Sequence, residues 1–234
     1  MNNKESQSFY LAIIGCDLYI DYFSSEDDNS NYQKKYLMPD TLDDNLNLSI
    51  LTKFILEKVK DFEKDVGNFV EKVNLITDAK YDLFCLSLKN KFSSNKIKDI
   101  DVVKLINDAK KLIIRNNKNC FILHILVDKY IVDGKEYFEL PENLYYNELI
   151  IDLSFITVQN SIIETLNRVL KDCNIEVKKI ISHQYSNRFA NKRDTSPCIA
   201  GKKVIEGINS SEVITRNDYS KKRGLFEKML NFFG

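Results

Sequence analysis

The chain is poor in the residues on which most catalytic and cofactor motifs depend. Its seven glycines never stand closer than six residues apart, so no loop offers the successive bare amides of a phosphate-binding or dinucleotide-binding fingerprint. The five cysteines are odd in number and lack a Cys-x-x-Cys spacing, which argues against a zinc site and a disulfide framework. Histidines, the usual general bases, number only two, His124 and His183. We therefore expect a protein that is not an enzyme, with no catalytic residue, no cofactor and no metal.

An excess of charge of one sign is also missing. The chain has 34 Lys and Arg against 34 Asp and Glu, which removes the overall attraction to nucleic acid. No run approaches the roughly 20 apolar residues of a membrane-spanning helix, and the first eight residues lack the apolar core of a signal peptide. Because 44% of the residues are hydrophobic, a packed core is expected. These features predict a cytoplasmic protein that binds no nucleic acid.

The first part of the chain alternates between strand and helix patterns. Residues 9–22 predict two strands around a turn at 15–17. A helix is expected over about 45–65, because apolar residues there recur every three or four positions, and a strand is expected over 70–76. The short run at 83–88 fits either a strand or a helix.

A second series of elements follows. The pattern predicts a helix that begins at Asp99, a hairpin over 121–138 around an Asp-Gly turn, and a strand over 145–156. It then predicts a helix over 157–173 and a strand over 175–182. A small sheet with helices on one face accounts for this order, which is that of an α+β unit. His124 falls on an apolar strand, so we expect a core histidine there.

The C-terminal part changes composition. Residues 187–220 are dominated by polar and charged side chains and predict a flexible linker. In 221–234, a helix would place every large apolar side chain on one side, with Glu227, Lys228 and Asn231 on the other. Such a helix behind a basic triplet is typical of interfacial membrane binding, although it could instead pack on its own domain. The candidate membrane-binding residues are Lys221, Lys222, Arg223, Leu225, Phe226, Lys228, Met229, Leu230, Phe232 and Phe233.

Several short motifs occur in a fixed order along the middle of the chain. They are Leu123-His124, Tyr130, the run from Val132 to Glu136, Pro141 and the run from Cys173 to Val177. In this order residues 102–189 resemble FtsA, the actin-like bacterial cell-division protein that tethers the division ring to the inner membrane. The resembling part is its subdomain 1C, which is of the SHS2 type.

The N-terminal part resembles a reduced subdomain 1A of the same family. Ile14-Gly15-Cys16 stands where the family has its first phosphate loop, but Ile13 replaces the acidic residue and Cys16 the hydroxyl residue. The second actin-like half, with its own phosphate and adenosine loops, is missing. The resemblance therefore implies that ATP binding and hydrolysis are lost.

The resemblance and the patterns together predict an α+β fold. It consists of a partial actin-like (ribonuclease H-like) half with an SHS2-type α/β subdomain, then a flexible linker and a terminal amphipathic helix. The predicted domains are a 1A-like subdomain at 1–89, a 1C-like subdomain at 90–186, the linker at 187–220 and the membrane-targeting helix at 221–234.

The implied function is that of a non-catalytic adaptor in bacterial cell division, peripheral on the inner face of the cell membrane. Anionic lipids, other division proteins and a second copy of the chain are its implied partners. Because the family's docking surface for FtsZ lies largely in the missing half, FtsZ binding is in doubt. Two alternatives stay open: a soluble SHS2-type module that binds a peptide or small ligand without a membrane role, and a degenerate ATPase completed by a second chain.

Overall fold

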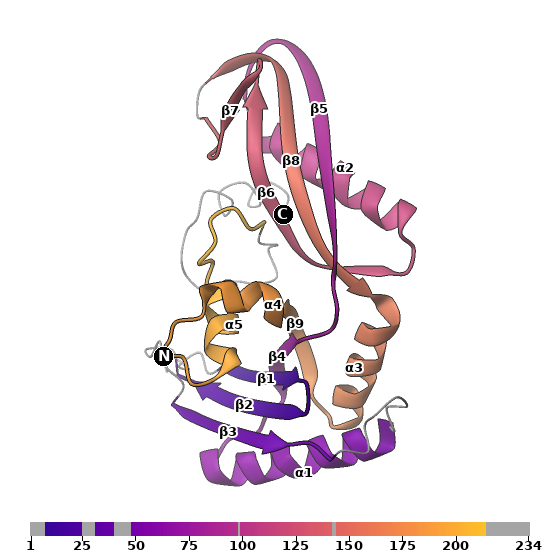
Figure 1. The fold of residues 1–234 in the computed structure, drawn as a ribbon, viewed down its shortest axis with the longest axis vertical. Helices are drawn as coiled ribbons and strands as arrows, with labels where there is room; N and C mark the ends of the chain where they lie inside the picture. Colours follow the sequence, from indigo (N-terminus) through magenta and orange to yellow (C-terminus); the bar gives the residue numbers. More distant parts are fainter. Residues whose placement is uncertain (1–7, 25–30, 40–47, 98, 142–143, 214–234) are drawn as a thin grey trace, which may run out of the picture. The chain divides into compact units, whose positions relative to one another are not determined.

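The computed structural model describes residues 8–24, 31–39, 48–97, 99–141 and 144–213 (Figure 1). They form a mixed α/β structure with two sheets that belong to two compact units. Unit 1 comprises Met1–Lys80 and Ser161–Ile208, and unit 2 comprises Tyr81–Asn160 and Asn209–Gly234. Each unit is therefore built from two separate stretches of the chain.

Unit 1 is organised around a five-stranded mixed sheet in the order β3-β2-β1-β4-β9. The three strands β1, β2 and β3 are antiparallel, whereas β1, β4 and β9 run parallel. The strands are β1 (Ser8–Ile14), β2 (Asp17–Phe23), β3 (Tyr32–Leu37), β4 (Lys72–Thr77) and β9 (Glu176–Ser182). The centre of β1 is buried on both sides, which requires a layer of helices on each face of the sheet.

Two helices of unit 1 are amphipathic in the way the sequence predicts. Helix α1 (Leu48–Val66) buries a stripe of Leu51, Ile55, Val59 and Phe62. Helix α3 (Asn160–Asp172) buries Ile163, Leu166, Val169 and Leu170. The Cys173 thiol at the end of α3 donates to the carbonyl of Thr52 in α1 at 3.4 Å, so the two helices are neighbours on the sheet.

The opposite face of this sheet is covered by residues predicted to be a flexible linker. After α4 (His183–Ser186) and a 3₁₀ turn η2 (Asn187–Phe189), helix α5 (Pro197–Ile205) packs on β1, β2 and β4. Figure 1 shows α1 and α5 on opposite faces of the sheet. The prediction of a flexible linker is therefore wrong over 187–213.

The packing of α5 explains the error. Ser196 caps the helix by accepting a hydrogen bond from the Cys198 amide, and Pro197 occupies its first turn. Gly201 faces β4, where an added Cβ would lie 2.7 Å from Ile76 Cγ1. Most residues of α5 are thus small or apolar and are buried. The polar residues before the helix, at 187–196, are what give the segment the composition of a linker.

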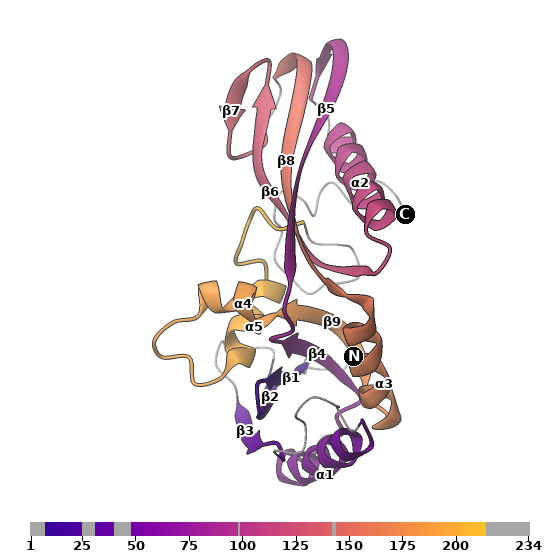
Figure 2. The same cartoon turned by 45° about the vertical axis from the view of Figure 1, so that its right-hand side comes forward.

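Unit 2 is an antiparallel sheet in the order β5-β8-β6-β7, with one helix on one face (Figure 2). Its strands are β5 (Asp82–Lys96), β6 (Cys120–Val132), β7 (Lys135–Tyr137) and β8 (Tyr145–Gln159). Helix α2 (Asp99–Asn116) contributes Val102, Leu105, Ile106, Ala109 and Ile113 to the core. Residues 83–88 are thus a strand, and the hairpin turn at Asp133-Gly134 has the positive φ angles of a type I′ turn.

The predicted boundaries at residues 89 and 186 differ from the observed units. Residues 81–89 belong to unit 2, with 82–89 in β5, and residues 161–186 belong to unit 1, where they contribute α3, β9 and α4. Strand β9 pairs with β4, about a hundred residues earlier in the chain. Local periodicity carries no information about such distant pairing. The prediction therefore grouped β9 with the elements that directly precede it in the chain.

The predicted membrane-targeting helix at 221–234 lies outside the described residues. Among the helices that are described, none is long and apolar enough to cross a membrane.

Candidate functional site

The carboxyl ends of the parallel strands in unit 1 are the first place to look for a site, because α/β sheets bind ligands at this edge. The registers pair Ile13 with Thr77, and Thr77 with Ser182. As a result, the β1–β2 turn, Asp78 and His183 follow three neighbouring strand ends. This is the edge at which the resemblance to FtsA predicts the counterpart of the family's first phosphate loop.

The β1–β2 turn is closed by a carboxylate of the chain itself. Gly15 takes a positive φ of 54°, and its amide donates to Asp78 Oδ2 at 2.6 Å. The neighbouring carbonyl of Cys16 accepts from the Met38 amide at 2.7 Å. An oxyanion approaching Gly15 would compete with an acceptor already in place and meet a like charge. The turn as it stands is unfavourable for binding a phosphate.

His183 is a second titratable group on this edge, and Asp78 is close enough to influence its pKa. Burial lowers the pKa of His183, and the nearby Asp78 only partly opposes that shift. Its buried Nδ1 has no hydrogen-bond partner among the described residues. The ring is therefore neutral at neutral pH. Within the described ranges no group of three or more His, Cys, Asp or Glu side chains is placed to hold a metal ion.

A second polar group of unit 1 lies under α5. Asp21 on β2 is fully buried, and neither of its carboxylate oxygens has a hydrogen-bond partner in the described part of the chain. Burial raises the pKa of Asp21 to about 7, and the nearby Ser196 and Cys198 side chains oppose this shift only in part. Burial, and then Asp21, raise the pKa of the Cys198 thiol well above its ordinary value. A buried acid beside a protonated thiol offers no reactive nucleophile, so this group is structural.

Unit 2 contains a buried polar pair, confirming the prediction of a core histidine. His124 on β6 and Glu212 lie with Nδ1 and Oε1 at 2.7 Å, and their side chains are 0% and 3% exposed. No local pattern pointed to Glu212, which lies in the segment predicted to be a flexible linker.

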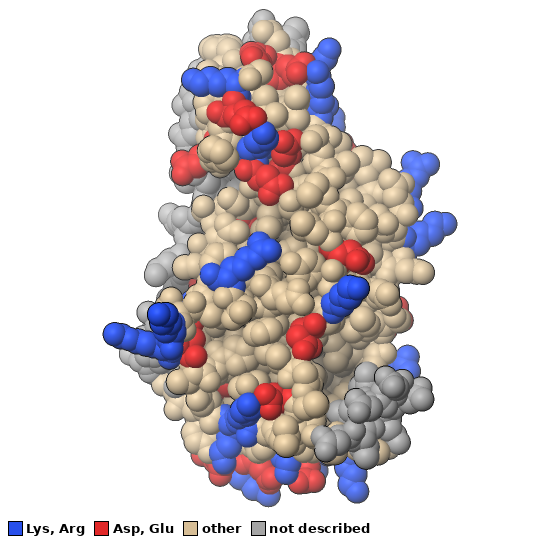
Figure 3. All heavy atoms as spheres, in the orientation of Figure 1, with Lys and Arg blue, Asp and Glu red and all other residues tan. Residues whose placement is uncertain are grey.

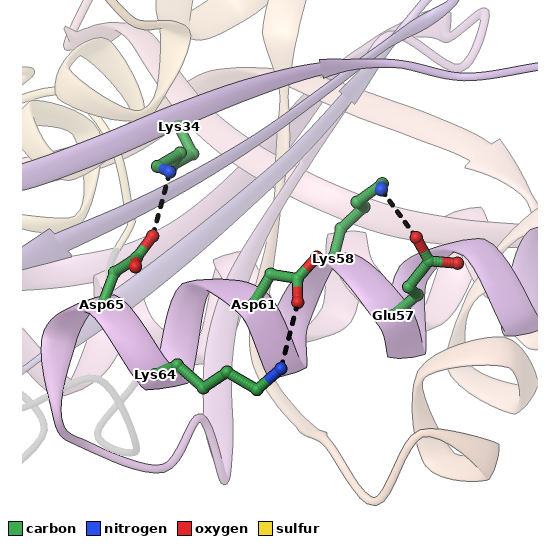
Figure 4. Close-up of polar contacts among 6 residues, drawn as sticks. All are labelled: Lys34, Glu57, Lys58, Asp61, Lys64 and Asp65. Carbon is green, nitrogen blue, oxygen red and sulfur yellow. Dashed lines mark hydrogen bonds and ion pairs between the residues drawn. The ribbon is translucent and has the colours of Figure 1, made fainter.

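The surface of α1 carries ion pairs rather than a charged patch. Figure 4 shows Lys34 of β3 beside Asp65, and Lys64 beside Asp61. The two pairs measure 2.9 and 3.4 Å and are solvent-exposed, as is the pair of Lys58 with Glu57. On the face drawn in Figure 3, Lys and Arg are interspersed with Asp and Glu. These pairs balance one another, so this face has no basic stripe of the kind that binds nucleic acid.

The ten predicted membrane-binding residues, from Lys221 to Phe233, lie outside the described residues. Of the positions that matter within the described part, the sequence identified the turn at Gly15 but not Asp78, because that contact joins residues 63 positions apart. An aspartate directly after a predicted strand was the signal available for it.

No family model matches the chain, and the search of curated proteins found no significant match. Two solved structures are similar to it. One is described as a PilM-PilN type IV pilus biogenesis complex, with 9% sequence identity and a TM-score of 0.45. The match covers 78% of this chain and 49% of that chain. The other, from Bacteroides thetaiotaomicron VPI-5482, is described as a protein with an actin-like ATPase fold and unknown function (14% identity, TM-score 0.32, 81% of this chain and 58% of that chain).

This chain thus spans only 49% and 58% of the lengths of these two proteins. Both TM-scores lie below 0.5, a level at which similarity does not establish a shared fold. Membership of the FtsA family therefore stays a prediction.

Proposed function

We propose that the chain is a non-catalytic adaptor of the FtsA type. It would bind the inner face of the cell membrane through residues 221–234, and a division protein or a second copy of itself through unit 2. The observation that carries this proposal is the pattern of residues 221–234, in which apolar and charged side chains separate onto opposite sides of a helix.

The energetics favour reversible binding by one chain. Each large apolar side chain contributes about 1.5–3 kcal/mol when fully buried and less at an interface. Each basic residue near an anionic leaflet adds about 1 kcal/mol. Ordering the helix offsets a large part of this gain. An assembly of several chains would therefore bind by avidity much more tightly than one chain.

The β1–β2 turn supports a role without nucleotide. The Asp78 carboxylate already accepts from the Gly15 amide, which is the donor that a phosphate-binding loop at this edge would need. With Ile13 where the FtsA family has an acidic residue, β1 itself supplies no carboxylate for a metal that accompanies ATP. We therefore propose that the chain binds no ATP.

The outer strand of unit 2 supports a role in binding proteins. Strand β5 lies at the edge of its sheet, and edge strands are where a further strand can pair. Its apolar residues Phe84, Leu86 and Leu88 pack on the core of unit 2 but are only partly buried. An added strand would complete their burial. This edge could serve another division protein or a second copy of the chain.

Co-sedimentation with vesicles containing anionic lipid tests the membrane role. We expect the full chain to pellet with the vesicles and a chain that ends at Tyr219 to stay in the supernatant. Equal pelleting of both would remove the C-terminal helix from the account. If neither chain pellets, the soluble SHS2-type module becomes the better description.

A thermal-shift titration with Mg-ATP tests the proposal that the chain binds no ATP. We expect no shift in the melting temperature. Saturable binding with a dissociation constant below about 1 mM, which corresponds to about 4 kcal/mol, would overturn the proposal. It would favour a degenerate ATPase completed by a second chain.

A further inference from the structure

The edges of the two sheets differ in how they are protected against pairing with another strand. The edge strands are β3 and β9 in unit 1, and β5 and β7 in unit 2. Lysines stand in the middle of β3 and of β9, and β7 has only three residues, two of them charged. Charge and short length are common means by which an edge strand avoids a partner. The first half of β5 has neither.

This part of β5 is a regular, uncharged edge on the opposite side of the sheet from β7 (Figure 2). Its register with β8 is unbroken from Asp82 to Lys91, and the six residues from Leu83 to Leu88 include no charge and no proline. Within the described residues, no strand pairs with its outer side. Leu83 is 55% exposed. A further strand along this edge would pair its backbone groups and cover its apolar side chains.

We infer that this edge binds the same strand of a second copy, antiparallel and centred on Leu86, an inference that rests on the proposed role of unit 2 in binding proteins and names the partner. In this register Leu86 lies opposite its own counterpart, and Phe84 lies opposite Leu88. Apolar residues therefore meet on the side that packs on the core of unit 2. Leu83 lies opposite Lys89, whose aliphatic stem can cover it. Two copies thus form one continuous sheet.

The symmetric pattern of β5 favours a second copy as the partner. Apolar residues stand two positions to either side of Leu86, and the uncharged Cys85 and Ser87 stand between them. A twofold axis through Leu86 therefore places residues of the same kind opposite each other, as an isologous interface requires. A register centred on Cys85 would instead place Asp82 opposite Leu88, which packs on the core.

Disulfide cross-linking between two different chains tests this register. The first chain keeps Cys85, and the second carries Cys85→Ser and Ser87→Cys. Both carry Cys16→Ser and Cys120→Ser, because those thiols are exposed or partly exposed. In the mixture, Cys85 of one chain lies directly opposite the new thiol of the other, at a Cα separation of about 4.5–5.5 Å that allows a disulfide. In either chain alone the thiols lie on a diagonal of about 7–8 Å, which is too long.

Oxidation with copper phenanthroline followed by a non-reducing gel measures the cross-link. We expect the mixture to give a covalent dimer, and each chain alone to give at least about fivefold less of it, because only the mixture has thiols within disulfide distance. A similar yield in all three samples, or no covalent dimer in any of them, would overturn the inference.

Charged variants at two exposed positions of β5 provide an independent test. Cys85→Lys with Ser87→Lys places lysine opposite lysine across the axis. The matched control, Cys85→Glu with Ser87→Lys, places glutamate opposite lysine. We expect the first pair to raise the dissociation constant of the dimer at least about tenfold relative to the control, because like charges directly opposite each other weaken strand pairing.

Sedimentation velocity of the full chain over a concentration series measures this constant. Equal dissociation constants in the two variants would contradict the inference, as would an unaltered chain that stays monomeric up to about 0.1 mM. Neither experiment changes residues 221–234, so the membrane role is tested separately. Vesicle binding without the cross-link would overturn the dimer and leave the membrane role standing, and a cross-link without vesicle binding would do the reverse.

Discussion

Asp21 in unit 1 and Glu212 in unit 2 both carry buried carboxyl groups, but the side chains around them differ. Glu212 lies 2.7 Å from a histidine nitrogen, whereas neither oxygen of Asp21 has a hydrogen-bond partner among the described residues. Asp21 lies on a sheet face beneath α5, and burial raises its pKa to about 7. A buried carboxyl group without a hydrogen-bond partner thus tends to become neutral.

The difference follows from what covers each group. Residues 211–213 bring Glu212 to β6 through backbone hydrogen bonds, so the pair of His124 and Glu212 is part of a sheet edge. Helix α5 brings the Cys198 thiol and the Ser196 hydroxyl towards Asp21. Neither side chain carries a positive charge, so neither acts as a counter-ion that would keep Asp21 ionised. Unit 2 thus has a buried hydrogen-bonded pair, whereas unit 1 has the buried Asp21, whose pKa is raised.

The largest expected effect is that of breaking the pair in unit 2. Glu212→Ala should lower the free energy of unfolding by about 3–5 kcal/mol, because it removes the buried carboxyl group that lies 2.7 Å from His124 Nδ1. Urea denaturation measures this change. Glu212→Gln is the control and should lose much less. A loss below about 1 kcal/mol in Glu212→Ala would mean that the pair does not hold residues 211–213 on β6.

A somewhat smaller effect is expected for Asp21, and it should depend on pH. The folded protein keeps a proton on Asp21 up to about pH 7, whereas an ordinary aspartate with a pKa of 3.8 loses it in the unfolded chain. The free energy of unfolding should therefore fall as pH rises from about 4 to about 7 and level off above that. Relative to Asp21→Asn, the fall should be about 2–4 kcal/mol.

Urea denaturation of the wild type and of Asp21→Asn at several pH values measures this difference. The two curves should diverge between about pH 4 and pH 7. Parallel curves over this range would show that Asp21 is as well compensated as Glu212, and the contrast between the two units would disappear.

The smallest of these effects concerns the fit of α5 over Asp21. Gly201→Ala should cost about 1–3 kcal/mol, because its Cβ would meet Ile76 Cγ1 at 2.7 Å. Ile76→Ala deletes both Ile76 atoms that lie close to that Cβ, namely Cγ1 and Cδ1. The double variant should therefore lose less than the sum of the single changes. Additive losses would indicate that α5 does not press on β4.

Much of the fold could be predicted from local patterns. The apolar stripes of α1 and α2, the β1–β2 turn at Gly15 and the hairpin at Asp133-Gly134 all follow from periodicity and turn chemistry within a short window. These elements are determined by neighbours in the sequence. The structure has them where the patterns predict them, with ends that differ by a few residues.

The pairing of distant segments could not be predicted in this way. The bond from Gly15 to Asp78 joins residues 63 positions apart, and the contact of His124 with Glu212 joins residues 88 positions apart. Polar composition also misled the prediction for α5. The residues just before this helix, 187–196, are mostly polar, whereas the nine residues of α5 include only two lysines. Discontinuous units arise from such long-range contacts, which leave no local periodic signal.

Vesicle binding by two tail variants tests the central claim, that residues 221–234 attach the chain to the membrane. Phe233→Glu places a charge in the middle of the apolar side of the helix, where it would have to be desolvated. Lys222→Glu reverses a charge in the basic triplet ahead of the helix, where only the attraction to the anionic leaflet changes.

Co-sedimentation over a range of salt concentrations distinguishes the two variants. Phe233→Glu should abolish binding at every salt concentration, and Lys222→Glu should weaken it mainly at low salt, because salt already screens that attraction. Neither variant should lower the melting temperature of the soluble protein. The account would be contradicted if Phe233→Glu still pelleted with the vesicles, or if it destabilised the soluble protein by more than about 1 kcal/mol, as expected for a helix packed on its own domain.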